Sequence, residues 1–321
     1  MERNFFRDTE KLKDEIKAKV FNNFTKVGNQ KVRDIVLQRQ KNSRYIKGVT
    51  SYYLHKGLNG KLSYNDAIDL AAAIEIYSTS MVLIDNLIDK HEQRDEETTF
   101  LEEYGPEMMG LASIYAANIG LFKLFPYLNN FFRITEADGF DAIGKAITSA
   151  VSMDVERPTQ SSQILENIVR VNGITLGFPL GLVASTATSD KSTIFEIMRY
   201  GTDTGTAFGL YEEIRDFVGE HGRSRASEMK SGRTPYFMAD LASRDPTFRI
   251  SSYIGREISD LEHQKLLELL RGKEALKRTQ RLIKNHLSYG RAILQRNLNQ
   301  EEFEVLDSLR TTIENSLDRM V

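Results

Sequence analysis

The sequence has no cysteine and no tryptophan, and only six of its 321 residues are proline. Without cysteine, the chain can form no disulfide and no thiolate zinc site, and it has no cysteine nucleophile. The first proline is Pro106. Because proline breaks helices, this scarcity favours long helices. The sequence also lacks sustained alternation of apolar and polar residues with hairpin turns, which argues against strands.

Neither sign of charge dominates, since 43 Lys and Arg oppose 45 Asp and Glu, for a net charge of −2. A general nucleic-acid binder would carry a basic excess, so we expect no nucleic-acid partner. No uninterrupted apolar run approaches the ~18 residues that suggest a membrane span. The first residues, MERNFFRDTEKLKDEIK, are charged throughout and contain no apolar signal core. We therefore expect a cytoplasmic protein with no integral membrane segment.

The apolar pattern predicts an all-α chain. Residues 67–89 carry apolar side chains at three- and four-residue steps on most sides, as in a helix buried nearly all round. The last third is more charged, with amphipathic stretches at 261–271 and 303–321. No internal repeat or flexible linker divides the chain, so we expect one domain over residues 1–321, with roughly ten or more helices. Loops are predicted near residues 59–60, 103–106, 157–162, 185–192 and 219–235.

Two acidic clusters close apolar segments. Asp85 and Asp89, in VLIDNLID, are four residues apart, so both carboxylates leave one helix face and repel each other unless a cation lies between them. Glu212 and Asp216, in GLYEEIRDF with Glu213 between them, share a face in the same way. Each cluster could simply be a solvated helix end. Facing each other across a cavity, however, they would suit Mg²⁺, which keeps several waters and bridges to substrate phosphates.

The sequence does not favour a histidine zinc site or a glycine-rich phosphate-binding loop. The five histidines show no metal-ligand spacing, and the sequence contains neither a P-loop nor a GxGxxG motif. Basic residues instead follow the acidic clusters or begin an early helix. They could provide surface solubility, or they could neutralise a polyphosphate that metal ions leave partly charged. These residues are Arg94, Lys230, Arg233, Arg44 and Lys47.

These patterns resemble the trans-isoprenyl diphosphate synthase family, also called the polyprenyl synthetase family, over roughly residues 40–240. Residues 85–89 resemble its first aspartate-rich motif, DDxxD, and residues 212–216 its second, which follows a Phe-Gln pair. SRYIKG resembles the family's early GKxxRP motif. Arg94 and Thr99 match the segment that has paired arginines and a later threonine. EMKSGRTPYFMADLA resembles the basic, glycine-containing stretch after the second motif.

The resemblance implies an isoprenoid-synthase helical bundle around a deep apolar cavity, with the two acidic motifs facing each other across its mouth. It implies three Mg²⁺ ions that bind the diphosphate of an allylic isoprenyl substrate, and a homodimer. The implied metal ligands are Asp85, Asp89, Glu212, Glu213 and Asp216. The implied diphosphate-binding residues are Arg94, Arg44, Lys47, Lys230 and Arg233. Asp85, Asp89, Arg94 and Lys230 are the expected catalytic residues.

The isoprenoid tail is expected to run along the face of the helix that carries Asp85. Side chains four and eight residues earlier share that face, which places Met81 and Tyr77 there with Ser80 beside them. Phe208, before the second motif, is expected to complete the tail pocket. Ordinary core contacts between helices are the alternative role for Tyr77 and Met81.

The sequence departs from the family mainly on the acceptor side. Asn86 and the two glutamates of the second motif keep oxygen ligands. Where the family has the second arginine of its pair, this chain has Asp95. Three further positions lack the family's group: Ser78 replaces a histidine, Gly209 a glutamine and Ile174 a lysine. The metal-bound allylic half is therefore kept, whereas the half that would bind isopentenyl diphosphate is eroded.

We therefore expect a Mg²⁺-dependent enzyme that ionises an allylic prenyl diphosphate and forms a terpene, or transfers the prenyl group to a non-standard acceptor. The first alternative is a chain-elongating prenyltransferase of the geranylgeranyl or polyprenyl diphosphate synthase type. The second is a non-catalytic subunit of a heteromeric synthase. A head-to-head synthase of the squalene or phytoene type is a further alternative, because EEIRDFVGE loosely resembles its second motif.

Overall fold

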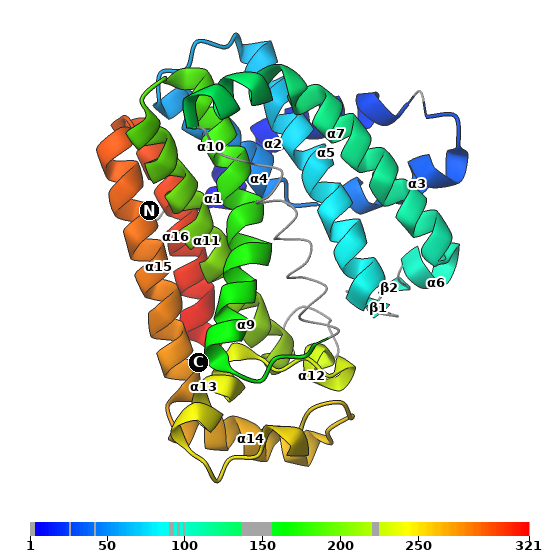
Figure 1. Ribbon diagram of the computed structural model, residues 1–321, viewed down its shortest axis with the longest axis vertical. Coiled ribbons are helices and arrows are strands. Elements are labelled where there is room, and N and C mark those ends of the chain that lie inside the picture. The colour runs from blue at the N-terminus through cyan, green and yellow to red at the C-terminus, as the bar shows by residue number, and fades with distance from the viewer. Residues whose placement is uncertain are drawn as a thin grey trace.

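The computed structural model describes residues 4–25, 27–41, 43–89, 93–94, 97–98, 100–135, 156–219 and 225–320. Helices make up nearly all of its regular structure, which confirms the all-α class (Figure 1). Among the described residues, the one sheet is a two-residue antiparallel ladder between β1 (Gln93–Arg94) and β2 (Glu97–Thr98). The side chains of Asp89 and Arg94 lie outside the description, as do Asp95 and Thr99 altogether.

Most of the described helices that follow one another directly are joined by short connections. Predicted breaks at 59–60, 103–106, 157–162, 185–192 and 219–235 all contain or adjoin a helix end, although the last holds one short helix. The elements, in chain order, are α1 (Phe5–Asp8), α2 (Glu10–Phe24), α3 (Gln30–Lys41), α4 (Ile46–Gly57), α5 (Tyr64–Asp89), α6 (Phe100–Tyr104), α7 (Pro106–Thr135), α9 (Ser161–Ile168), η1 (Val169–Ile174), α10 (Thr175–Ala187), α11 (Lys191–Val218), α12 (Ser227–Ser231), α13 (Tyr236–Arg244), η2 (Ile250–Ser252), α14 (Asp260–Gly272), α15 (Ala275–Asn297) and α16 (Gln300–Met320).

Helix α5 lies inside the bundle, between α4 and α7. Residues 70–74 are each at most 2% exposed, so more than a full turn is buried on every side. This confirms the burial predicted from its apolar pattern. Each buried Leu or Ile side chain contributes about 1.5–3 kcal/mol of transfer free energy, which fixes the helix that ends at Asp85 and Asp89.

Helix α11 is held by close backbone contact with η1 and α10. A Cβ atom on Gly201 would lie 2.6 Å from the Cα of Gly177, and one on Gly205 would lie 2.2 Å from the carbonyl oxygen of Asn172. Only glycine permits this approach. The η1 segment is a π-helical turn, a feature often found at functional sites. These contacts fix the register of the helix that carries Glu212.

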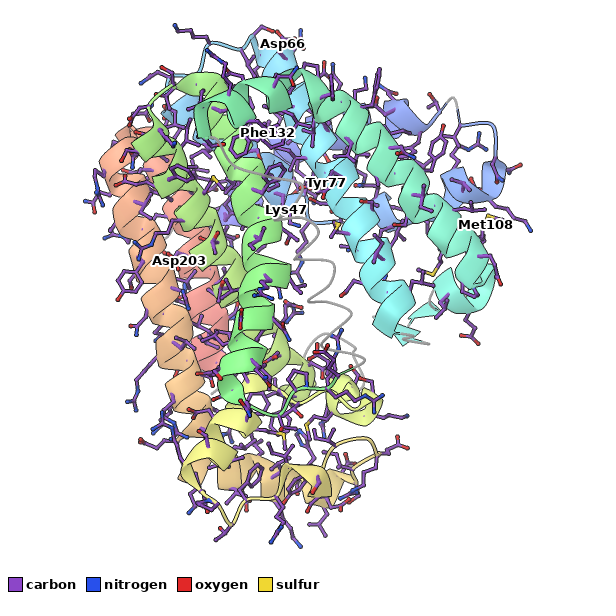
Figure 2. The ribbon with its side chains drawn as sticks, viewed as in Figure 1. Lys47, Asp66, Tyr77, Met108, Phe132 and Asp203 are labelled. Carbon is purple, nitrogen blue, oxygen red and sulfur yellow. The ribbon has the colours of Figure 1, made fainter. Side chains whose placement is uncertain are left out.

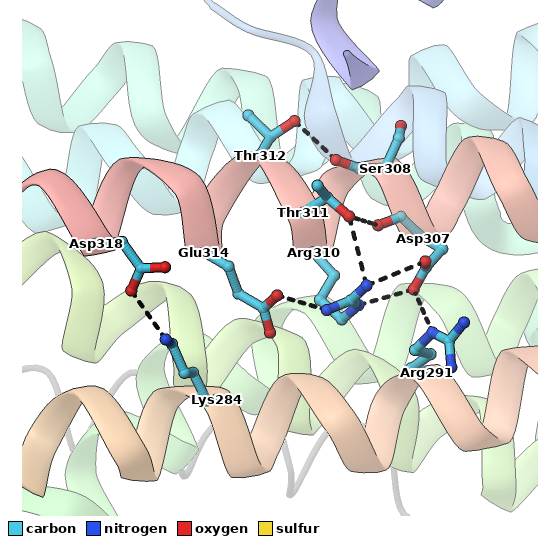
Figure 3. A network of polar contacts seen from close by, with 9 residues as sticks. All are labelled: Lys284, Arg291, Asp307, Ser308, Arg310, Thr311, Thr312, Glu314 and Asp318. Carbon is cyan, nitrogen blue, oxygen red and sulfur yellow. Dashed lines mark hydrogen bonds and ion pairs between the residues drawn. The ribbon is translucent and has the colours of Figure 1, made fainter. Parts of the chain in front are cut away.

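Helices α15 and α16 form the opposite side of the bundle and are joined by ion pairs (Figure 3). Asp307 accepts hydrogen bonds from Nε of Arg310 at 2.8 Å and from Nε of Arg291 at 3.1 Å. The other face of the Arg310 guanidinium reaches Glu314 at 2.5 Å. One turn further, Lys284 donates to Asp318 at 2.8 Å. These contacts tie the two C-terminal helices together.

Three helical stretches are long and apolar enough to cross a membrane by length and composition alone, although none of them is an uninterrupted apolar run. In Tyr64–Leu87 and Ser161–Ala187, 78% and 67% of the apolar window is buried by neighbouring helices. Their apolar character therefore serves the core of the bundle. In Pro106–Thr135 only 33% of the window is buried, so α7 presents a large apolar face outward.

Candidate functional site

A pocket of about 240 Å³ opens between the end of α3, the start of α4, the middle of α5 and the last turns of α11. We call it the basic pocket, because four of its lining residues are basic and two are acidic. It is lined by Arg39, Ser43, Arg44, Tyr45, Ile46, Lys47, Glu75, Ser78, Thr79, Val82, Phe208, Glu212 and Arg215.

Glu75 forms one wall of the basic pocket and anchors the start of α4. Its carboxylate accepts a hydrogen bond from the backbone N–H of Gly48 at 2.6 Å. Burial raises the pKa of Glu75, and the hydrogen bond from Gly48 and the charges of Lys47 and Arg39 partly oppose that shift. A Cβ atom on Gly48 would lie 2.8 Å from the Glu75 side chain, so this close approach needs glycine.

The turn into α4 is held in a conformation that side chains rarely adopt. Tyr45 has a φ of 54°, in the left-handed region, and is 1% exposed. Its hydroxyl donates to the backbone carbonyl of Gln40 at 3.0 Å. Such strain persists only where surrounding contacts enforce it, and it clusters at functional sites. Here it directs Arg44 and Lys47, on either side of Tyr45, to the pocket.

Lys47 reaches the pocket from the second position of α4 (Figure 2). Burial lowers the pKa of its ammonium group, whereas the charge of Glu75 opposes this shift and that of Arg39 adds to it. Its Nζ makes no hydrogen bond or ion pair with any residue of the described ranges. An ammonium group held this way has unused capacity to bind an anion.

Arg215 adds a cation from the opposite wall. Its side chain is 5% exposed, and Nη1 lies 2.5 Å from Oε1 of Glu212. The guanidinium carbon lies 5.6 Å from the centre of the Tyr211 ring. Its Nε is buried without a hydrogen-bond partner, as is the hydroxyl of Ser78 across the pocket. Unfilled buried polar groups beside an excess of positive charge indicate an anion site.

The other two carboxylates of the second acidic cluster bind the protein itself. Asp216 is 3% exposed and accepts hydrogen bonds from the hydroxyl of Ser227 and from the backbone N–H of Glu228, the latter at 3.1 Å. Glu213 accepts from the backbone N–H of Tyr236 at 2.8 Å. Burial raises the pKa of Glu213 well above its usual value; the charge of nearby Glu228 adds to this and the Tyr236 hydrogen bond opposes it. Both carboxylates thus hold the chain around α12.

The chain around α12 carries two of the predicted diphosphate-binding residues. Lys230 is 61% exposed, and its Nζ lies 3.6 Å from Glu257. Arg233 donates its backbone N–H to the carbonyl of Glu228 at 2.9 Å, and its charge acts on the Glu213 carboxyl. Neither side chain lines the basic pocket. The structure therefore joins Arg44 and Lys47 with Glu212, and holds Lys230 and Arg233 on a separate segment.

The first acidic cluster lies one turn beyond the pocket wall on α5. Asp85 follows Val82 by three residues, is partly exposed, and makes no hydrogen bond or ion pair with any described residue. Within the described ranges, no group of three or more acidic or histidine side chains stands close enough to hold a metal ion. Asp85 and Glu212 nevertheless offer the type of ligand atom that Mg²⁺ prefers, because Mg²⁺ binds carboxylate and water oxygens.

The predicted tail residues lie in different surroundings. Ser80 is fully buried; its carbonyl accepts from the hydroxyl of Ser113 on α7 at 3.0 Å. The backbone of Tyr77 lies against Gly120 of α7, and burial raises the pKa of its hydroxyl to about 12. Phe208 lines the basic pocket instead, and Met81 packs partly buried against the core.

Several residues of the site were missed in the sequence. Glu75 could have been found, because a carboxylate inside an apolar helix is rarely left without a role. Arg215 follows Glu212 at the spacing of an ion pair along a helix. Asn172 gives no signal of its own: a Cβ atom on Gly209 would lie 2.6 Å from its Nδ2. Its amide therefore fills the space that a side chain at position 209 would take.

Comparison with known proteins identifies a family and solved structures that are similar to this chain. The profile of the polyprenyl synthetase family matches residues 26–284. A search of curated protein sequences gives no match. Solved structures match over almost the whole chain. Geranylgeranyl pyrophosphate synthetase from Pyrococcus horikoshii has a TM-score of 0.84 at 13% identity, covering 97% of this chain and 98% of that one.

Two further structures were solved with ligands. Polyprenyl synthase from Caulobacter crescentus, complexed with calcium and isoprenyl diphosphate, has a TM-score of 0.82 at 15% identity, over 97% and 96% of the two chains. Geranylgeranyl pyrophosphate synthase from Corynebacterium glutamicum, complexed with isoprenyl diphosphate and magnesium, has a TM-score of 0.75 at 16% identity, over 97% and 100%. At such low identity these structures show a shared fold. With the profile match over most of its length, the chain belongs to the polyprenyl synthetase family.

Proposed function

We propose that this protein ionises an allylic isoprenyl diphosphate with the help of Mg²⁺. The observation that carries the proposal is the basic pocket, which places Glu212 of the second acidic cluster opposite the helix that ends in Asp85 and Asp89. Membership of a prenyltransferase family supports it. So does the isoprenyl diphosphate bound in two structural relatives.

The chain's own groups divide the work. Asp85, Asp89 and Glu212 would hold Mg²⁺, which when bound withdraws charge from the leaving diphosphate. Arg44 and Lys47 would bind the phosphate oxygens. Glu213 and Asp216 would fix the segment around α12, which would bring Lys230 and Arg233 to the departing anion, and Arg94 would act on the same anion from β1. The apolar side chains of α5 would exclude water, which would otherwise react with the allylic carbocation that ionisation forms.

A second candidate function is chain elongation with isopentenyl diphosphate. The observation that favours it is the charge of the basic pocket. The sequence departures predicted an eroded acceptor half, yet Arg39 and Arg215 line this pocket beside Arg44 and Lys47. A second anion could therefore bind there. In the first function the same charge would serve a different anionic acceptor, or the single diphosphate.

Incubation with C10, C15 and C20 allylic diphosphates and Mg²⁺, with and without isopentenyl diphosphate, separates the two functions. Mass analysis should reveal a terpene or prenyl alcohol without isopentenyl diphosphate if the first function holds. Products longer by one or more isoprene units would establish elongation. No consumption of any substrate would refute both.

The outward face of α7 supports the expected homodimer. Five of its large apolar side chains are between 39% and 79% exposed. They follow a helical repeat on one side of α7: Leu111, Ile114, Tyr115, Phe122 and Phe125. We propose that a second copy of the chain covers this face. Light scattering should find a dimer, and Phe122→Glu should shift it to monomer. A monomeric wild type that binds lipid vesicles through the same face would overturn the dimer.

A further inference from the structure

Arg215 connects the basic pocket to the acidic cluster. Its guanidinium lines the pocket and at the same time pairs with Glu212, through Nη1 and Oε1 at 2.5 Å. Among the carboxylates of the second cluster, Glu212 is the one that lines the pocket, because Glu213 and Asp216 accept hydrogen bonds from backbone N–H groups. Glu212, which would hold a metal ion, is therefore paired with the guanidinium of Arg215.

The ion pair leaves Arg215 incompletely satisfied. The side chain is 5% exposed, and its Nε is buried without a hydrogen-bond partner. The Nζ of Lys47 and the hydroxyl of Ser78 face the same pocket without partners among the described residues. An oxyanion of phosphate size would supply acceptors to these donors, and a guanidinium binds such anions with paired N–H groups.

We propose that Arg215 is a positioning residue that exchanges partners: an oxyanion in the basic pocket draws its guanidinium away from Glu212 and frees that carboxylate for a divalent cation. The inference rests on the proposed function, since it assumes that Glu212 binds metal. It makes anion and cation binding cooperative. By linkage, each ligand then raises the affinity of the other by the same factor.

The energetic reason is the cost of a buried charge that loses its partner. A divalent cation that takes Glu212 alone leaves Arg215 enclosed and uncompensated, which is strongly unfavourable. An oxyanion on Arg215 removes that cost. The cation should therefore bind weakly while the pocket is empty and more tightly once an anion is present. If the Arg215 guanidinium is removed by substitution, the divalent cation should bind with the higher affinity even when no anion is present.

The test uses Mn²⁺ as the cation, followed by the electron paramagnetic resonance signal of the free ion. Sulfate is the anion, because it chelates Mn²⁺ only weakly. Chloride keeps the ionic strength constant. In the wild type, saturating sulfate should raise Mn²⁺ affinity by about fivefold or more, the lower end of typical coupling. Arg215→Leu should bind Mn²⁺ more tightly than wild type without sulfate, and sulfate should change its affinity by less than about twofold.

Three matched variants isolate the exchange. Lys47→Met removes a pocket cation that does not touch Glu212, so it should weaken the sulfate effect and leave the sulfate-free Mn²⁺ affinity unchanged. Arg170→Leu breaks an exposed ion pair with Glu166 and should behave as wild type. Arg215→Gln should reproduce the result of Arg215→Leu and replaces it if that variant does not fold.

The outcomes separate this inference from the proposed function. If Mn²⁺ binding depends on Asp85 but sulfate affects the Arg215 variants as it affects wild type, the exchange is refuted and the proposed metal site stands. If wild type binds no Mn²⁺ with or without sulfate, both are refuted. Loss of the sulfate effect in the Arg215 variants, with its retention in Arg170→Leu, supports the exchange.

Discussion

The charged contacts of two regions follow opposite rules. On α16, beside α15, Arg310 lies between Asp307 and Glu314 and forms a short ion pair with each (Figure 3). In the basic pocket, cations outnumber carboxylates, and Lys47 and Arg215 keep unused donors in buried surroundings. Folding alone would not favour the second arrangement, because unfilled buried donors cost free energy. The contrast separates charges that hold the fold from charges that we propose to bind a ligand.

The largest expected effect comes from removing a carboxylate that we propose to bind Mg²⁺. Asp85→Ala should lower the rate of allylic diphosphate ionisation by about 10²-fold or more, since electrostatic groups at a developing charge carry effects of this size. The variant's stability should change little, because Asp85 makes no hydrogen bond or ion pair with any described residue. Diphosphate release and urea unfolding measure the two quantities.

The matched control lies at the other end of the same helix. Asp66 begins α5 and accepts a hydrogen bond from the hydroxyl of Ser63 at 2.6 Å (Figure 2). Asp66→Ala should keep full activity. Equal loss of activity in both variants would mean that general negative charge, rather than the position of Asp85, matters.

Two neighbouring residues of the second acidic cluster allow the same comparison within one helix turn, because Glu212 lines the pocket and Glu213 holds the backbone. Glu212→Gln should lose most activity, whereas Glu213→Gln should keep activity within about threefold. Gln at 213 still accepts from Tyr236 but has no charge to bury. Because burial raises the pKa of Glu213 in the fold, its ionised form opposes folding above its unfolded pKa.

The sign of the pH effect follows. Glu213→Gln should be more stable than wild type at pH 7. This advantage should be absent below pH about 4, where the unfolded glutamate is also protonated, and should grow as the pH rises from there. Unfolding curves at several pH values measure it. A variant less stable than wild type at pH 7 would contradict the structural role of Glu213.

The smallest expected effect lies on the opposite side of the molecule. Arg310→Ala breaks partly buried ion pairs with Asp307 and Glu314, and should lower the free energy of unfolding by about 1–2 kcal/mol. Activity of the folded protein should not change. Urea unfolding at pH 7 measures the first quantity. A fall in turnover of the folded variant would show that these ion pairs also support the candidate site.

The helical fold could be predicted because apolar residues recur in the sequence at helical spacing. The apolar stretch at 67–89 became a helix that is buried on all sides over residues 70–80, and the predicted loops lie at or near helix ends. The outward face of α7 was not foreseen, because apolar residues look alike in sequence whether they face a core or the surface. The short ladder of β1 and β2 leaves no periodic signal.

The site was predicted by kind of residue rather than by orientation. Glu212, Glu213 and Asp216 looked equivalent, yet Asp216 and Glu213 turn to backbone N–H groups of a segment more than ten residues later. No spacing rule reveals such distant partners. The roles of all the predicted site residues remain predictions, and for Asp89 and Arg94 the side chains also lie outside the described residues. The spacing of Arg215 from Glu212 indicates an ion pair, but the sequence does not show that this pair lines a pocket.

The central claim is that this protein breaks the carbon–oxygen bond of an allylic diphosphate. An allylic diphosphate with ¹⁸O in the bridging position tests it most directly, since ionisation and return move the label into non-bridging positions of recovered substrate. We predict Mg²⁺-dependent scrambling by the wild type, with or without product formation, and none by Asp85→Ala. Recovered substrate with its label entirely in place, from folded wild-type protein that binds Mg²⁺ and the substrate, would contradict the account.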